Sequence, residues 1–151
     1  MKLSPPPANL ETQCPEVKTS PLPTLHCYDA RPAATIRTCL ELDQALHKAE
    51  LHYPSDHPVI VSLYSRGFHV EIGLGLTRSF ISIQRCEPRL GPRVITVGDP
   101  GAEGGLVFFN LHGDRTELPA RNLLPASDAR QIFREFFNTG VASTNFPWEA
   151  A

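Results

Sequence analysis

Few residues of this chain have types and spacing suited to chemistry, and a histidine–glutamate pair is the most suggestive. His69-Val70-Glu71 has the H-x-E form in which zinc deaminases use the histidine as metal ligand and the glutamate to move protons. That chemistry also needs P-C-x-x-C, but no second cysteine follows Cys86 at that spacing. In a strand pattern, His69 and Glu71 instead share one polar face. An alternative hypothesis groups them with Arg66 in a small ligand-binding domain or enzyme.

The other candidate motifs do not match a known chemistry. His47, His52 and His57 are five residues apart, a spacing that fits neither one helix face nor one strand face. The Gly-Leu-Gly of residues 73–75 lacks the third glycine and the following helix of a phosphate loop. No G-x-S-x-G is present. The sequence therefore predicts no catalytic, cofactor-binding or metal-binding residues, and no enzyme.

Charged residues of one sign gather in two places. Residues 78–93 contain four arginines, which we interpret as a solvated loop cluster: Arg78, Arg85, Arg89 and Arg93. The carboxylates that gather further along the chain are Asp99, Glu103, Asp114 and Glu117. Ordinary solvated turns would account for these four, as would a negative rim that meets a basic partner. We predict that they contact a partner protein, together with His69 and Glu71.

Composition limits the classes of protein that the chain can belong to. Its 151 residues suffice for one domain, and a net charge of −2 argues against a nucleic-acid binder with a broad basic face. No apolar run reaches the roughly 18–20 residues that span a bilayer, and the segment MKLSPPPANLETQ has no apolar core of a secretory signal. The cysteines are Cys14, Cys27, Cys39 and Cys86. Since none forms a C-x-x-C, we predict free thiols and a cytoplasmic protein without membrane contact.

The elements that would position these residues begin after a proline-rich segment. Residues 1–35 contain seven of the fifteen prolines, and proline fixes φ and removes a hydrogen-bond donor. We therefore predict a flexible arm over 1–35 and a single domain over 36–151.

Two amphipathic helices are predicted, one at each end of the domain. The first begins with the capping box of residues 38–41 and ends before Pro54. The second starts at Pro125 and stops at Gly140, where a glycine suits the left-handed cap. The apolar positions of the two stripes are Leu42, Ala45, Leu46 and Ala49 in the first, and Ala129, Ile132, Phe133, Phe136 and Phe137 in the second.

The region between the helices reads as a series of short strands. The predicted strands cover residues 59–64, 68–74, 79–84, 93–97, 106–110 and 116–118. Short links favour antiparallel neighbours, because a parallel pair needs a long crossover. The predicted fold is α+β: a single antiparallel sheet of about six strands, a meander, packed against an N-terminal and a C-terminal amphipathic helix.

Several segments after residue 94 carry a resemblance to a known family. They are VGDPG (97–101), GLVFF (105–109), TELP (116–119), NLLP (122–125), DAR (128–130), FREFF (133–137), Gly140 and PWE (147–149). In these segments, and in element order over residues 38–150, the chain resembles the first-described family of immunity proteins of bacterial polymorphic toxin systems. The hairpin at 111–115 departs from that family's aromatic and glycine pattern.

The resemblance implies a non-enzymatic inhibitor that needs no cofactor. Members of that family commonly lie beside deaminase-type toxins, so the implied partner is a cognate deaminase toxin domain in a one-to-one complex. The chain would block the active site or substrate groove of the toxin in the cytoplasm of the producing cell. A stable interface of this kind needs only about 800 Å² per partner, which one sheet face or loop edge provides.

Overall fold

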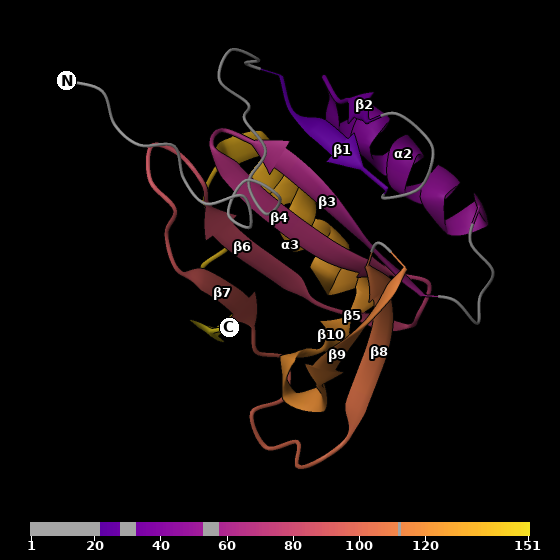
Figure 1. Ribbon diagram of the computed structural model, residues 1–151, viewed down its shortest axis with the longest axis vertical. Coiled ribbons are helices and arrows are strands. Elements are labelled where there is room, and N and C mark those ends of the chain that lie inside the picture. The colour runs from indigo at the N-terminus through magenta and orange to yellow at the C-terminus, as the bar shows by residue number, and fades with distance from the viewer. Residues whose placement is uncertain (1–21, 28–32, 53–57, 112) are drawn as a thin grey trace.

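The computed structural model describes residues 22–27, 33–52, 58–111 and 113–151 (Figure 1). Helices and strands both contribute, so the α+β prediction is confirmed. In chain order the elements are β1 (Thr24–His26), β2 (Ala34–Thr35), α2 (Cys39–His52), β3 (Val59–Ser65), β4 (Phe68–Leu74), β5 (Arg78–Ser79), β6 (Ile81–Arg85), β7 (Arg93–Thr96), β8 (Leu106–Leu111), β9 (Asp114–Pro119), the 3₁₀ turn η1 (Ala120–Asn122), β10 (Leu124–Pro125), α3 (Ala126–Thr139) and β11 (Trp148–Ala150).

The main sheet has nine strands among the described residues, so the prediction of about six is wrong. Seven of them follow the order β11-β7-β6-β4-β3-β1-β2, with antiparallel neighbours throughout. The predicted meander is limited to β3, β4, β6 and β7. The β8–β9 hairpin joins β3 through one parallel pair, Val59 with Asn110, and projects from the sheet in Figure 1. A separate two-stranded pairing links β5 and β10.

The strands that the sequence failed to indicate are short and depend on pairing partners. β1 lies within the proline-rich segment, yet Leu25 is only 2 % exposed and pairs with Leu63 of β3. Three-residue strands carry too little alternation to be seen in sequence, because tertiary pairing decides them. Residues 1–21 and 28–32 of the predicted arm lie outside the described residues, and the boundary at residue 35 stays a prediction.

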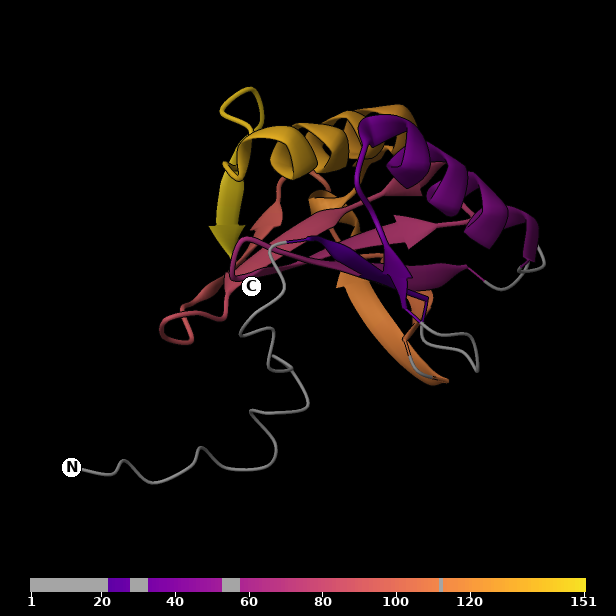
Figure 2. The same ribbon diagram turned by 90° about the horizontal axis from the view of Figure 1, so that it is seen from above.

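Both helices cover the same face of the sheet (Figure 2). The Thr38 hydroxyl accepts the Glu41 N–H at 3.1 Å, as the capping box predicts. The Glu41 carboxylate accepts the N–H of Arg37 at 3.0 Å instead of that of Thr38. At the end of α3, Gly140 adopts φ 74° and donates to the Phe136 carbonyl at 2.8 Å, which is the predicted left-handed cap.

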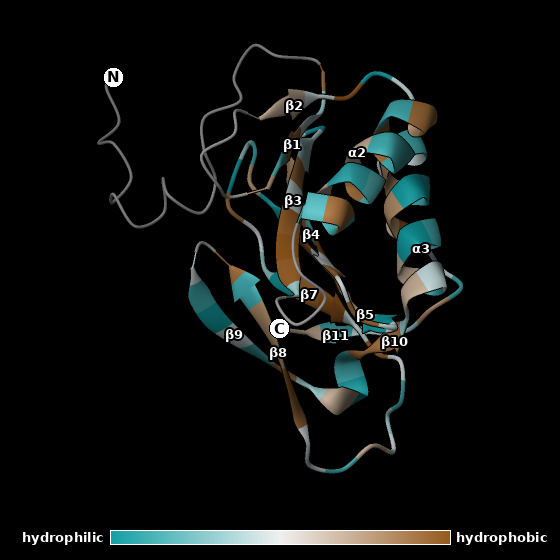
Figure 3. Cartoon of the chain, turned by 90° about the vertical axis from the view of Figure 1, so that its right-hand side faces the viewer, coloured by the Kyte–Doolittle hydropathy of each residue, from teal (hydrophilic) through white to brown (hydrophobic). Residues whose placement is uncertain are grey.

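Apolar side chains form two clusters, one on each side of the sheet. The larger cluster joins the inner stripes of α2 and α3 to β3, β4 and β6. The smaller one lies under β8 on the opposite face, where the rings of Phe80 and Phe109 meet edge to face at 5.4 Å. Gly73 permits this approach, because a Cβ there would lie 2.5 Å from the Phe109 ring. Figure 3 shows hydrophobic residues in brown along β3 and β8, and hydrophilic residues in teal along much of α2 and α3.

The cysteine prediction is confirmed for Cys27 and Cys39, which form no disulfide, and wrong for Cys86, which is disulfide-bonded. Sequence spacing could not reveal this, because a disulfide depends on the distance between Cα atoms in the fold. The predicted cytoplasmic location rested partly on reduced thiols and stays a prediction. Across the described ranges, no helix combines the length and apolar character that crossing a membrane requires.

Candidate functional site

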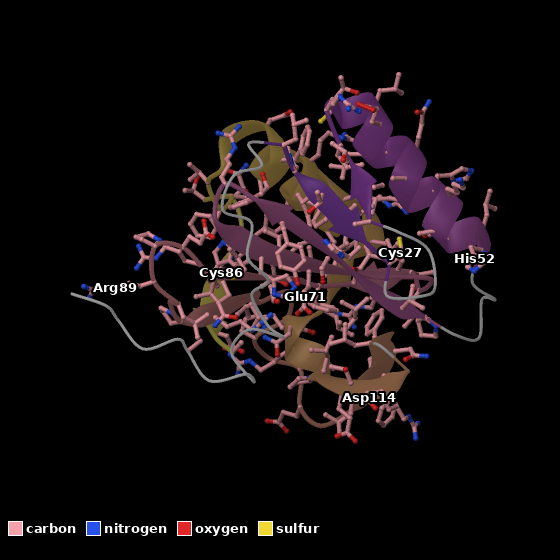
Figure 4. All side chains as sticks on the ribbon, turned by 45° about the horizontal axis from the view of Figure 1, so that its top comes forward. Cys27, His52, Glu71, Cys86, Arg89 and Asp114 are labelled. Atoms are coloured by element: carbon pink, nitrogen blue, oxygen red, sulfur yellow. The ribbon has the colours of Figure 1, made fainter. Side chains whose placement is uncertain are left out.

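The predicted polar face of β4 exists, on the side of the sheet away from the helices. Arg93 of β7 donates to the Glu71 carboxylate at 2.8 Å, and the Ser82 hydroxyl donates to the same oxygen at 3.0 Å. The side chain of Glu71 is only 11 % exposed, against 27 % for that of Arg93. Arg93 therefore belongs to a half-buried ion pair, and the prediction that it lies in a solvated loop cluster is wrong. Figure 4 shows Glu71 near the centre of the sheet.

His69 is built into the same face by ring stacking and a hydrogen bond. Its ring stacks on that of Tyr64, with centroids 4.7 Å apart and planes 7° from parallel. Its Nε2 lies 3.0 Å from the Ser62 hydroxyl and 3.9 Å from a Glu71 carboxylate oxygen. Since His69 and Glu71 are 4 % and 8 % exposed as whole residues, a partner docking on the surface would meet their neighbours first.

Arg66 lies on the other side of the sheet from His69 and Glu71. It forms the β3–β4 turn with Gly67, at φ 55° and 81°, the two positive values of a type I′ hairpin. Its guanidinium donates to the Asn138 carbonyl at 3.0 Å, at the C-terminal end of α3, where positive charge is favourable. The structure thus does not bring together the three residues of the enzyme or ligand-binding hypothesis.

A surface hollow of about 530 Å³ lies at the β3–β4 turn, and its described lining residues are Arg66, Gly67, Glu87 and Pro88. Neither His69 nor Glu71 is among them. Within the described part of the chain, no three side chains of His, Cys, Asp or Glu are grouped to hold a metal ion.

The four predicted acidic residues are all exposed but do not form one continuous rim. Asp99 and Glu103 lie in the loop between β7 and β8. Glu117 faces outward from the middle of β9, opposite Phe108. Asp114 lies at the far end of that hairpin and on its other face, because successive strand residues alternate. Figure 4 shows Asp114 on the outlying hairpin, away from Glu71.

The loop between β7 and β8 that contains Asp99 and Glu103, the acidic loop, is held at its start by η1 and, through η1, by Glu149 of β11. The N–H groups of Gly98 and Asp99 both donate to the Arg121 carbonyl, at 2.9 and 3.0 Å. The Asn122 amide donates to a β7 carbonyl at 2.9 Å and to the Glu149 carboxylate at 2.8 Å. Arg121 binds the other oxygen of Glu149 at 2.8 Å. We call Gly98, Asp99, Arg121, Asn122 and Glu149 the clasp.

The clasp joins three of the sequence segments that carry the resemblance, VGDPG, NLLP and PWE. The sequence does not indicate that these three segments position the acidic loop. Asn122 is 3 % exposed in the structure, and a buried amide needs several hydrogen-bond partners. The signal available in the sequence was an asparagine directly before the apolar pair Leu123-Leu124.

A comparison with models of protein families finds a match. The family model described as "Immunity protein Imm1" matches residues 30–150, which is more than three quarters of the chain. The match spans both helices, the strands from β2 to β11 and the whole clasp. No curated protein matches the chain.

Proposed function

The chain belongs to the Imm1 family of immunity proteins, and on that premise we propose that it neutralises a cognate toxin of a bacterial polymorphic toxin system by binding to it. The proposed toxin is a nucleic-acid deaminase, held in a one-to-one complex in the cytoplasm with its active site or substrate groove covered. The observation that carries the proposal is the family match over residues 30–150. The likeness to a family commonly found beside deaminase toxins supports the choice of toxin.

The charge and rigidity of the acidic loop support a role in binding. A toxin that acts on nucleic acid needs a basic surface for phosphates, and an inhibitor can meet that surface with carboxylates. Asp99 and Glu103 are exposed on a loop whose first residues are fixed by the clasp. A fixed loop loses little conformational entropy on binding, so its charges are already oriented. We keep Asp114 and Glu117 as further contacts, and His69 and Glu71 as residues that shape the sheet beneath.

A survival assay tests the proposal. The C-terminal domain of the toxin encoded immediately upstream is induced in a test bacterium, with and without this chain. We expect the toxin alone to reduce the number of viable cells, and co-expression of the chain to restore it. The control is an unrelated protein expressed at the same level. Continued killing by an active toxin in the presence of folded chain would contradict the proposal.

Charge reversal tests the acidic loop itself. Asp99→Lys with Glu103→Lys should weaken toxin binding about tenfold or more, mostly through slower association that depends on salt. Only one hydrogen bond is lost, from the Gly101 N–H to Asp99, so the free energy of unfolding should change by less than about 1 kcal/mol. Glu87→Lys is the matched control on another exposed loop. Equal affinity for the double variant and the control would remove the loop from the interface.

A further inference from the structure

The β8 strand has apolar side chains on both faces, but the described residues cover only one of them. Its sequence, LVFFNL, is almost continuously apolar, which is typical of strands buried on both sides. The inner face contributes Val107, Phe109 and Leu111 to the smaller core cluster. On the outer face, Leu106 is 51 % exposed and Phe108 is half-buried. Figure 3 shows β8 in brown beside the largely teal β9.

The register of the hairpin surrounds this outer apolar face with charge. Glu117 of β9 lies directly opposite Phe108, and Arg115 lies on the diagonal. The Arg115 guanidinium carbon is 3.7 Å from the centre of the Phe108 ring, a cation–π contact that covers one side of the ring. We define Leu106, Phe108, Arg115 and Glu117 as the outer hairpin face.

The charge balance around the outer hairpin face indicates the chemistry of its partner. Glu117 lies on the face itself, and Glu103 lies in the loop that leads into Leu106. The nearby cation Arg121 is paired with Glu149 in the clasp, and Arg115 lies against an aromatic ring. An apolar centre with a charged rim is typical of a protein-binding site. The two carboxylates, Glu103 and Glu117, outnumber Arg115, the guanidinium on the face itself, so the rim favours a basic partner.

We infer that the outer hairpin face is the site at which the toxin docks, with Leu106 and Phe108 as its apolar anchors and Glu117 as its ion-pairing group. The inference rests on the proposed function and adds the location of the interface to it. The occupant is the basic face of the toxin domain, which supplies an aliphatic or aromatic side chain over Leu106 and a Lys or Arg to Glu117. Buried apolar anchors at the centre of an interface dominate its affinity.

The test compares single substitutions on the outer hairpin face with matched ones elsewhere. The probe is the domain of the toxin encoded immediately upstream, inactivated by substitution, and its affinity for the full chain is measured by calorimetry. Leu106→Arg and Glu117→Arg are expected to weaken binding by about tenfold or more each. The controls are Leu51→Arg on α2, a leucine that is 74 % exposed, and Glu87→Arg, which should each change affinity by less than about twofold. Thermal melts verify that every variant is folded.

Each outcome has a distinct meaning. If the unaltered chain binds the toxin and both hairpin variants bind equally well, the docking face is wrong and the proposed function stands. If the unaltered chain fails to bind the inactivated domain of a toxin whose unsubstituted form is active, the proposed function fails and the docking inference fails with it. Sedimentation of the free chain tests a second copy as occupant. A dimer that Leu106→Arg dissociates would assign the face to self-association and overturn the inference.

Discussion

Substituting Gly98 by alanine should destabilise the protein, because the main chain of Leu123, directly after the clasp residue Asn122, leaves no room for a side chain there. A Cβ at this position would lie 1.8 Å from the Leu123 carbonyl oxygen and 2.5 Å from its carbon. Both atoms belong to the main chain, so a rotamer change cannot relieve the overlap. The requirement is for close approach, since the φ of Gly98 lies outside the left-handed region.

The loss in the free energy of unfolding can be estimated from the part of the main chain that the alanine displaces. The β7–β8 loop has to withdraw from the 120–123 segment, which stretches the two hydrogen bonds from Gly98 and Asp99 to the Arg121 carbonyl. Overpacking costs about 1–3 kcal/mol, and each lost hydrogen bond about 0.5–1.5 kcal/mol. Because these costs overlap, we expect a loss of about 2–4 kcal/mol in the free energy of unfolding, or about 5–15 °C in Tm for a chain of this length.

Urea denaturation followed by circular dichroism measures this loss. Gly101→Ala is the control in the same loop, because its Cβ would meet nothing closer than the Asp99 carboxylate at 3.6 Å. The control should differ from the unaltered protein by less than about 0.5 kcal/mol. If Gly98→Ala is as stable as Gly101→Ala, the clasp does not fix the loop as described.

Three further predictions concern a close contact, a half-buried ion pair and a helix cap. Gly73→Ala should cost about 1–3 kcal/mol by displacing the Phe109 ring, and Phe109→Leu in the same chain should recover part of it in urea melts; no recovery would contradict the contact. Arg93→Ala should cost about 3–5 kcal/mol, because it leaves the buried Glu71 carboxylate without its cation. Adding Glu71→Gln should reduce that cost in a double-mutant cycle, and strict additivity would refute the coupling. Thr38→Ala should cost about 1 kcal/mol through loss of the α2 cap, and an unchanged denaturation midpoint would refute the cap's contribution.

The sequence predicted those parts of the fold that carry their own periodic signal. Alternation over 68–74 and the apolar run of 59–64 correspond closely to β4 and β3. The stripe after Pro125 gave α3, which begins one residue later than expected. By contrast, β1, β2 and β11 have two or three residues each and exist only as partners of longer strands. Their positions depend on the three-dimensional order of the sheet, which short-range pattern does not contain.

The candidate site was predicted unevenly for a similar physical reason. The four carboxylates that the sequence predicts as partner contacts are all exposed. The burial of Glu71 was missed because its cation, Arg93, is 22 residues away and two strands across. The outer hairpin face was missed as well, because an almost continuously apolar strand indicates two covered faces, whereas the described residues cover one.

The most direct test of the central claim is a titration of purified toxin domain with the purified chain, with catalytic turnover as the readout. Neutralisation by binding predicts that activity falls linearly with added chain and reaches the background at one equivalent. Undiminished turnover of an active toxin in the presence of excess folded chain would contradict the account.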